Sequence, residues 1–303
     1  MAILDTLVLI LGQTILPISL VVLVGLILAR RMALNTQTIG RVTFYLFSPA
    51  LIFRGLYQTD LDYSTVGRTA LLAALLFVVS GLLGWLSSAG EERRRRAAIA
   101  LTSALSNNGN MGLSVSLFAF GEPGLALAMI YFVTTAFLGN TVGVFVASSG
   151  KAKPLEALRR TAQVPMLYGA ILGLLLGYFQ VELPLGLMRS VDTLAGAAVP
   201  TLLVLLGAQL SQAPIQGRQL VLARTSFIRL AGGPILAVLF CLLFGVSGLE
   251  RTIVILQSAM PTAVSATVLA TEYDAAPNLV ATIVATTTVV SLVSVSGVLW
   301  MLS

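Results

Sequence analysis

The chain is poor in residues on which soluble enzymes depend. It has no histidine and one cysteine, and only 10% of its 303 residues are charged. The missing histidine removes the commonest metal ligand and the usual proton shuttle, and a single cysteine forms neither an intramolecular disulfide nor a metal cluster. Soluble domains carry about 25% charged residues, so this composition excludes a soluble enzyme, a nucleic-acid-binding protein and a disordered chain.

Apolar residues are what the chain has in abundance. Hydrophobic residues make up 57% of it, and its mean hydropathy is +0.96. A helix that spans a bilayer needs about 20 apolar residues, and the alternation typical of a membrane β-barrel is absent from the sequence. The sequence therefore predicts an all-α integral membrane protein with ten transmembrane helices. The apolar segments are roughly 7–29, 36–57, 66–87, 97–119, 124–147, 164–180, 186–210, 219–246, 250–271 and 277–302.

Basic residues are concentrated in alternate loops between these segments. Eleven of them fall on one side of the membrane and two on the other, and the positive-inside rule predicts that the basic loops are cytoplasmic. Both termini are then expected outside, in a multi-pass protein of the cytoplasmic (inner) cell membrane. The eleven are Arg30, Arg31, Arg93, Arg94, Arg95, Arg96, Lys151, Lys153, Arg159, Arg160 and Arg218, and the two are Arg189 and Arg251.

The two halves of the chain resemble each other weakly. Pro17 recurs as Pro165 at a shift of 148 residues, and the fourth and fifth segments align with the ninth and tenth at a shift of 154. Because each half holds five segments, the two copies must have opposite orientations in the membrane, which is the inverted-repeat plan of secondary transporters. We expect one repeat at 1–150 and the other at 151–303.

Helix-breaking and polar residues interrupt two corresponding segments at mid-span, at 106–112 and at 257–263. Unwound backbone at this depth is tolerated only where it is buried in protein or lines a cavity, and a matched pair of interruptions is a strong pointer to a transporter's binding site. Each interrupted helix offers free N–H groups with partial positive charge, which favour a carboxylate or another anion. Neutral donors at the same positions are Asn107, Asn108, Asn110 and Thr262.

A simpler interpretation of these residues is that asparagine and glycine only pack helices against each other. Three asparagines within 107–110 are costly in a membrane for packing alone, and this favours a binding site. Ser48, beside Pro49 in the second segment, either caps a freed carbonyl or lines the transport path.

The acidic residues bear on how transport is driven. All twelve fall in loops or near helix ends, so we expect no buried carboxylate proton relay. A sodium site built from carbonyl and side-chain oxygens stays open, and an uncoupled anion carrier driven by the membrane potential needs no ion site. The candidate ion ligands are Ser106, Thr134, Thr135, Gln257 and Ser258.

Other charged and small residues carry further expectations. Arg229 lies within the eighth segment, and a charge inside the membrane is by default a functional hypothesis; it either attracts an anionic substrate or holds a helix carbonyl. The run 91–96 is interpreted as an anchor at the cytoplasmic surface, with lipid head-group binding as the second interpretation. Gly169, Gly173 and Gly177 are expected to pack closely against another helix.

Five stretches, taken together in their order and spacing, resemble the auxin efflux carrier family. They lie at 15–31, 47–53, 107–113, 120–124 and 257–263. The resemblance is to prokaryotic members of this family, within the superfamily of bile acid, arsenite and riboflavin transporters. It implies ten helices in two inverted five-helix repeats with helices 4 and 9 broken and crossing, as in bile acid sodium symporters.

The same resemblance implies how the protein works. Helices 1, 2, 6 and 7 would form a scaffold, helices 3–5 and 8–10 a mobile transport unit, and the scaffolds of two subunits a homodimer. Gly109 and Pro261 would complete the crossover. The full set of candidate substrate-binding residues is Asn107, Asn108, Gly109, Asn110, Pro261, Thr262, Ser48, Gln257, Tyr131 and Arg229.

The helix breaks thus predict a secondary transporter of small organic anions. The resemblance implies that it exports acids such as malate, malonate or auxin-like acids by elevator-type alternating access. A sodium-coupled symporter of organic acids or bile-acid-like sterols is the alternative. A channel and a non-transporting receptor are further alternatives, and the matched helix breaks argue against a receptor. No phosphate-binding loop, nucleophile elbow or metal motif is present, so we expect no enzymatic activity, cofactor, metal or nucleic-acid partner.

Overall fold

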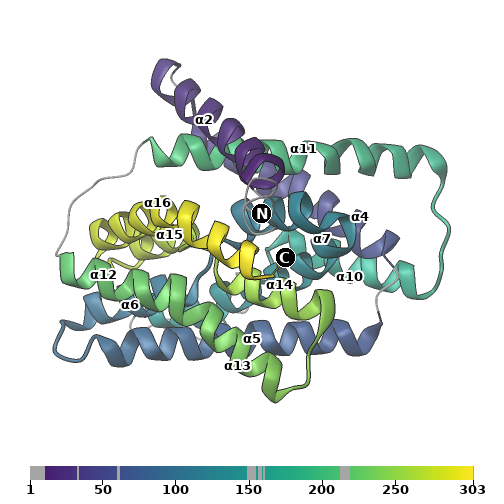
Figure 1. Ribbon diagram of the computed structural model, residues 1–303. Coiled ribbons are helices and arrows are strands. Elements are labelled where there is room, and N and C mark those ends of the chain that lie inside the picture. Colours follow the sequence, from purple (N-terminus) through teal and green to yellow (C-terminus); the bar gives the residue numbers. More distant parts are fainter. Residues whose placement is uncertain are drawn as a thin grey trace.

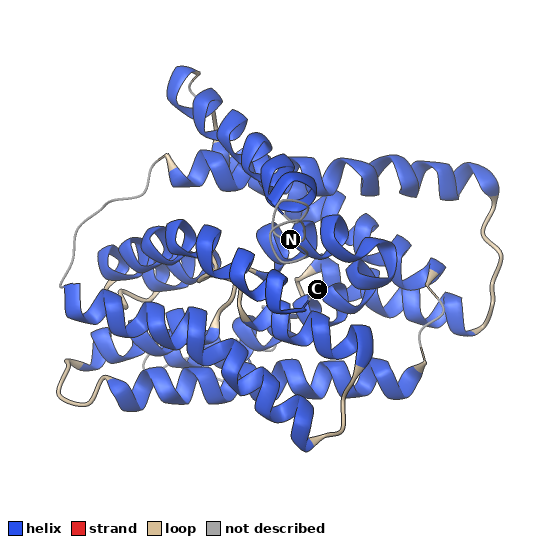
Figure 2. Ribbon diagram, viewed as in Figure 1, coloured by secondary structure: helices blue, strands red, loops and turns tan. Residues whose placement is uncertain are grey.

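The computed structural model describes residues 11–32, 34–59, 62–148, 155, 159, 161–211 and 219–302. Every regular element within these residues is a helix, as Figures 1 and 2 show. The expected all-α fold is therefore confirmed. Four of the basic residues on which the predicted orientation depends lie outside the described residues, and the orientation itself stays a prediction. They are Lys151, Lys153, Arg160 and Arg218.

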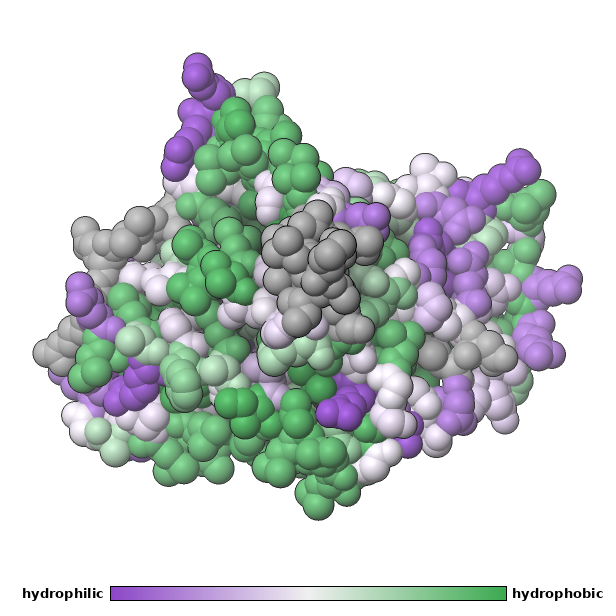
Figure 3. All heavy atoms as spheres, in the orientation of Figure 1, coloured by the Kyte–Doolittle hydropathy of each residue, from purple (hydrophilic) through white to green (hydrophobic). Residues whose placement is uncertain are grey.

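Six helices in the described part are long and apolar enough to cross a membrane. Helices satisfy their own backbone groups, which lipid is unable to hydrogen-bond. Exposed apolar side chains cover much of the face drawn in Figure 3, in green. Together these features support a multi-pass membrane protein, while the ten-helix count stays a prediction. The six are Gly12–Arg31, Tyr63–Ser87, Asn108–Ala147, Leu185–Leu210, Gln219–Leu243 and Pro277–Leu302.

The first half of the chain forms helices with several π-helical turns, labelled η. Where one helix runs directly into the next, the π-turn widens the helix by one residue without ending it. In chain order the elements are η1 (Leu11–Ile15), α2 (Leu16–Arg31), α3 (Thr36–Val42), η2 (Thr43–Phe47), α4 (Ser48–Gln58), α5 (Tyr63–Ser87), α6 (Arg93–Ala104), η3 (Asn108–Gly112), α7 (Leu113–Leu138), η4 (Gly139–Gly143) and α8 (Val144–Ala147).

The second half follows a similar order. A shorter apolar helix, Pro165–Tyr178, comes first, and the other elements include a second interrupted helix. The elements are α10 (Pro165–Tyr178), α11 (Leu185–Leu210), α12 (Gln219–Phe227), η5 (Ile228–Gly232), α13 (Gly233–Leu243), α14 (Gly248–Ser258), α15 (Ser265–Glu272) and α16 (Pro277–Leu302).

A change of direction divides α7 at Gly121. The backbone there has φ 64° and ψ −163°, which is not helical and is a conformation that glycine adopts readily. Next to it, Glu122 accepts a hydrogen bond of 2.8 Å from Arg54 of α4. The boundary between the fourth and fifth apolar segments therefore lies at this turn, where the sequence predicts it.

Two pairs of helices approach so closely that only glycine fits between them. A Cβ on Gly207 of α11 would lie 1.9 Å from the Val22 carbonyl oxygen of α2, and a Cβ on Gly25 would lie 2.2 Å from that of Val204. On α10, a Cβ on Gly169 would lie 2.6 Å from the Pro49 carbonyl oxygen. The close packing predicted for the α10 glycines is thus confirmed, and α4 is the partner.

The buried apolar side chains form three clusters. Two of them draw only on α5–α8, α13–α16 and their connections, with Phe77, Leu101 and Val280 in one and Leu72, Tyr131 and Cys241 in the other. The third joins α2, α4, α10 and α11 to α7, α14 and α16. Helices α5–α8 and α13–α16 therefore share cores of their own.

Candidate functional site

Two helices are interrupted at the positions that the sequence predicts. The helix α6 ends at Ala104 and η3 begins at Asn108, with extended backbone at Leu105 (φ −80°, ψ 102°). Likewise α14 ends at Ser258 and α15 begins at Ser265. Each interruption leaves a carbonyl end and an amide end of a helix inside the protein.

The two interruptions pair with each other through their backbones. The Asn107 N–H donates to the Pro261 carbonyl oxygen at 2.7 Å, and the Ala263 N–H donates to the Leu105 carbonyl oxygen at 2.9 Å. These bonds form one antiparallel bridge, centred on Ser106 and Thr262. The pairing satisfies backbone groups that would otherwise be buried without partners, and it sets the crossing of the two chain segments.

Asn108 and Gln257 hold the crossing together from the side. The Asn108 Nδ2 donates to the Gln257 carbonyl oxygen at 2.8 Å and to its Oε1 at 2.9 Å. In turn the Gln257 Nε2 donates to the Gly112 carbonyl oxygen at 3.0 Å and to Ser116 Oγ at 2.9 Å. Both side chains are fully buried. Their hydrogen bonds are used within the protein, so their role in the structure is to position the crossing.

Hydroxyl groups complete this network, and several are the candidate ion ligands. Ser106 Oγ donates to Asn108 Oδ1, which also accepts from Thr135 Oγ1 at 3.3 Å. Thr134 and Ser258 donate instead to carbonyls of their own helices, those of Ile130 at 2.8 Å and Ile255 at 2.7 Å. The five candidates therefore do not converge as one set: Ser106, Thr135 and Gln257 bond to Asn108, whereas Thr134 and Ser258 bond to their own helices.

Thr262 joins the crossing to the interrupted helix α6 and to one further helix, α16. Its Oγ1 donates to the Thr102 carbonyl oxygen at 2.9 Å, and its N–H donates to Thr287 Oγ1 at 3.2 Å. Thr287 and Ser116 are residues that the sequence analysis missed. The only signal for Thr287 is a run of three threonines, 286–288, in an otherwise apolar helix.

Asn107 differs from its neighbour Asn108. It is 4% exposed, and its Nδ2 has no hydrogen-bond partner in the described part of the protein. A buried polar group without a partner costs about 1–3 kcal/mol. Asn110 is partly buried, and only its backbone carbonyl has a partner among the described residues, the Ser114 hydroxyl at 2.9 Å. The side-chain amides of Asn107 and Asn110 are therefore the donors at the crossing that could still bond to a ligand.

Arg229, from η5, is 2% exposed and contacts both helix ends. Its Nη1 donates to the Ser103 carbonyl oxygen at 2.7 Å, and its Nη2 donates to that of Ser258. A Cβ on Gly233 would lie 2.5 Å from the same Ser258 oxygen, so glycine allows this approach. Of the two roles that the sequence left open, the geometry favours the holding of helix carbonyls.

The remaining candidates are Tyr131, Ser48 and Gly109. Tyr131 is 2% exposed and belongs to the apolar cluster with Leu72 and Cys241. Ser48 is buried at the start of α4. A Cβ on Gly109 would lie 2.8 Å from the Phe132 ring. Neither Tyr131 nor Ser48 hydrogen-bonds to the crossing within the described residues.

Comparison with known families bears on the whole length of the chain. Residues 10–156 and, separately, 154–299 each match the family described as "Membrane transport protein". The chain belongs to this family, the one that contains the auxin efflux carriers. The expected family is thereby confirmed. Two successive matches to one family also agree with an internal duplication.

The relatives of this membrane transport protein cover it almost from end to end. An "Uncharacterized transporter" of Methanothermobacter thermautotrophicus is 27% identical over 93% of this chain and 95% of its own. A transporter of Methanocaldococcus jannaschii is 26% identical over 88% and 90%. A Rhizobium meliloti protein named "Putative malonate transporter" is 26% identical over 95% and 94%. The chain is a membrane transporter by family.

Proposed function

We propose that this protein is a secondary transporter that exports small organic anions, and that the crossing of the two interrupted helices binds them. The carboxylates in question are dicarboxylates such as malate or malonate, or auxin-like acids. The observation that carries the proposal is that a charged side chain contacts the carbonyl ends of the helices at the crossing, whereas the amide ends have no acidic residue in their first turns.

Four helix ends meet there, and the Arg229 side chain contacts two of them. The carbonyl ends of α6 and α14 carry partial negative charge and contact the Arg229 guanidinium. The amide ends that begin at Asn108 and Ser265 carry partial positive charge, and neither has an acidic residue in its first turn. The crossing therefore has an excess of positive potential without a free lysine or arginine, and this favours an anion.

Asn107 supplies a neutral donor at the same place. Because its Nδ2 is buried and has no partner in the described residues, a ligand oxygen would relieve an existing penalty. Asn110 provides a second amide, and the paired backbones at Ser106 and Thr262 hold both in place. Pro261 and Gly109 shape the backbone on either side.

The relative from Rhizobium meliloti supports a carboxylate as the substrate class, since malonate appears in its name. Malonate is therefore the first probe to use.

We infer further that the ten helical segments form two inverted repeats and work by an elevator mechanism. The two clusters confined to α5–α8 and α13–α16 support a rigid transport unit. The glycine contacts of α2 with α11 and of α4 with α10 support a separate scaffold. The homodimer through the scaffold and the outward position of both termini belong to the same proposal.

The sodium-coupled alternative finds less support at the crossing. A sodium ion needs several oxygens pointing to one position, whereas Thr134 and Ser258 hydrogen-bond to their own helices. We therefore propose transport without sodium, driven by the membrane potential, which contributes about 2.3 kcal/mol per charge at 100 mV.

The test is transport by the full chain reconstituted in liposomes. Labelled malonate, with malate and indole-3-acetate as competitors, should accumulate according to an imposed potential, with or without sodium. The Asn107→Ala variant should bind malonate about tenfold or more weakly, since a hydrogen bond to a charged group contributes about 1.5–3 kcal/mol.

The matched control is Asn140→Ala. Asn140 also lies within an apolar span, but its Nδ2 already has a partner, the Ala136 carbonyl oxygen four residues earlier, at 2.8 Å. It should bind malonate like the parent protein. Equal affinity in Asn107→Ala and the parent, for every acid that is transported, would remove the crossing as the binding site.

A further inference from the structure

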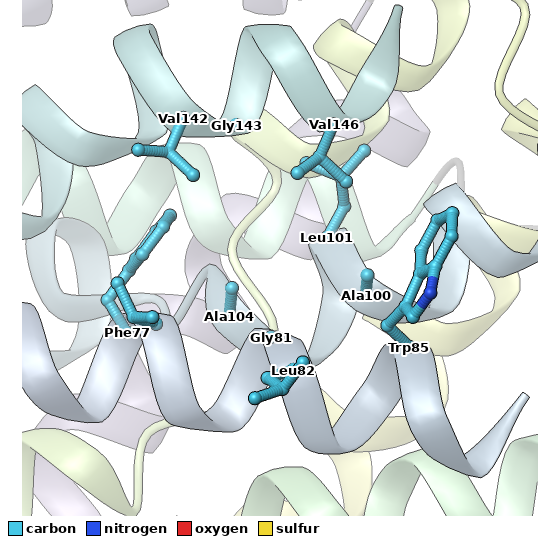
Figure 4. Close-up of a pocket in the computed structure, with 11 residues that line it drawn as sticks. Phe77, Gly81, Leu82, Trp85, Ala100, Leu101, Ala104, Val142, Gly143 and Val146 are labelled. Carbon is cyan, nitrogen blue, oxygen red and sulfur yellow. The ribbon is translucent and has the colours of Figure 1, made fainter. Parts of the chain in front are cut away.

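A cavity of about 220 Å³ lies between α5, α6 and the segment formed by η4 and α8. Figure 4 shows its walls: Phe77, Leu82 and Trp85 come from α5, and Val142 and Val146 face them from the opposite side. The lining is almost entirely apolar, and small residues on α6 make room for it. Ala104, the last residue of α6 before the crossing, lines one part of this cavity, and the other lining residues lie along α5, α6, η4 and α8.

The cavity opens toward the surface that a bilayer would cover. Val78 and Leu82 at its edge are 50% and 52% exposed, and Val142 on the other side is 39% exposed. The helices that carry them are among those apolar enough to span a membrane. The cavity volume, about 220 Å³, is smaller than the roughly 300–1,000 Å³ of sites for drug-sized ligands. An apolar groove of this size on a lipid-facing surface fits part of an acyl chain.

A cation lies at one end of this cavity. The Arg96 guanidinium carbon is 4.2 Å from the centroid of the Trp85 ring, and Trp85 is a wall of the cavity. Arg96 is also one helical turn before Ala100, which lines the cavity from α6. The charged group and the apolar groove are therefore adjacent.

Arg96 has no anionic partner in the described part of the protein. Its neighbours do: Arg94 pairs with Asp274, and Arg95 lies 3.5 Å from Glu91. The Arg96 Nε is buried without a hydrogen-bond partner, and its Nη2 reaches only the Trp85 carbonyl oxygen, at 3.5 Å. A cation held beside an aromatic ring in this way is available to an incoming anion.

The start of α6, near Arg96, also favours an anion. α6 begins with four arginines, has no acidic residue in its first turn, and has no side-chain cap from Glu92. Cations at a helix N-terminus oppose the helix dipole, whereas a phosphate there would be stabilised by both the helix dipole and the arginines.

We propose that Arg96, the start of α6 and this cavity form a binding site for an anionic phospholipid. The lipid phosphate contacts Arg96 and the first N–H groups of α6, and part of one acyl chain occupies the cavity behind Trp85. A tryptophan at the boundary between head groups and hydrocarbon is the usual arrangement in membrane proteins. A zwitterionic lipid binds less well, because its own cation meets the same arginines.

The head-group part is tested on the full-length protein after removal of lipid in detergent. Native mass spectrometry would titrate phosphatidylglycerol against phosphatidylcholine with identical acyl chains. Arg96→Gln should reduce the preference for phosphatidylglycerol about fivefold, the effect expected of one interfacial charge. Arg94→Gln is the matched control, because it also removes one charge from the four arginines at the start of α6, but Arg94 already pairs with Asp274. This variant should keep most of the preference for phosphatidylglycerol. Equal losses in both variants, or no loss in Arg96→Gln, would overturn the site.

The acyl-chain part needs a second pair of variants. Val142→Trp should fill the mouth of the cavity and weaken phosphatidylglycerol binding severalfold, while Phe145→Trp, on an exposed residue outside the lining, should not. Leu82→Trp fills the same mouth from α5 and serves if Val142→Trp does not fold. Unchanged binding in the folded mouth variants, or full displacement of the lipid by glycerophosphoglycerol without acyl chains, would show that no lipid is held there.

Discussion

Arg229 donates a hydrogen bond of 2.7 Å to the carbonyl oxygen of Ser103, a residue 126 positions earlier in the chain. The same guanidinium also contacts the Ser258 carbonyl, so that one side chain from η5 caps the ends of both interrupted helices. A single guanidinium therefore holds the carbonyl ends of α6 and α14. The amide ends at the crossing begin at Asn108 and Ser265, and the proposed function assigns the anion to them.

Replacement of Arg229 should therefore affect stability and anion binding together. In Arg229→Met, buried carbonyls lose their partner, and each such group costs about 1–3 kcal/mol. We expect a lower Tm in detergent and no measurable stabilisation by malonate in a thermal-shift titration. Arg229→Lys restores the charge and should recover part of the malonate response. If the lysine and methionine variants respond alike, charge at this position is not what matters.

Gln257 should be essential for stability because it bonds on both sides of the crossing. Gln257→Leu would leave Asn108 Nδ2, the Gly112 carbonyl and Ser116 Oγ short of partners, at about 2–4 kcal/mol in total. Gln209→Leu is the control, since the Gln209 Oε1 is buried and has no partner in the described residues. The Tm should fall clearly in the first variant and remain within a few degrees in the second. A similar Tm for both would refute this role.

Gly207 should not tolerate even a methyl group. In Gly207→Ala the added Cβ meets the Val22 carbonyl oxygen at 1.9 Å, so α2 and α11 must separate. Gly196→Ala on the same helix meets nothing within 4 Å, and a better helix former there should be neutral or stabilising by up to about 1 kcal/mol. Thermal unfolding in detergent compares the two. Equal stability would mean that the α2–α11 contact is looser than described.

The ion pair between Arg68 and Glu250 should matter more than the one at the surface. Glu250 is 6% exposed and also accepts from Thr69 Oγ1 at 3.1 Å, which ties α5 to α14. Glu250→Gln should cost about 1–3 kcal/mol, less than for a fully buried pair because Arg68 is 39% exposed. Asp274→Asn breaks a pair whose side chains are 67% exposed, and should cost under about 1 kcal/mol. A larger loss of Tm in the asparagine variant would contradict this ranking.

The sequence predicts well those features that depend on composition and local breaks. Long apolar runs with few charges specify helices in a membrane, because lipid leaves the backbone no other way to satisfy its groups. The breaks near Asn107 and Pro261 are also readable, since asparagine, glycine and proline disfavour a continuous helix wherever the chain goes. Within the described residues, both breaks lie where the sequence places them.

The roles of the individual polar residues were not readable in the same way. Asn107 and Asn108 are identical in type and adjacent in sequence, yet one amide is fully bonded to Gln257 and the other has no partner among the described residues. The sequence likewise leaves two roles open for Arg229, and its contacts with the Ser103 and Ser258 carbonyl oxygens favour one of them. Hydrogen bonding is short-ranged and directional, so residues more than a hundred positions apart acquire these roles only when the tertiary structure brings them together.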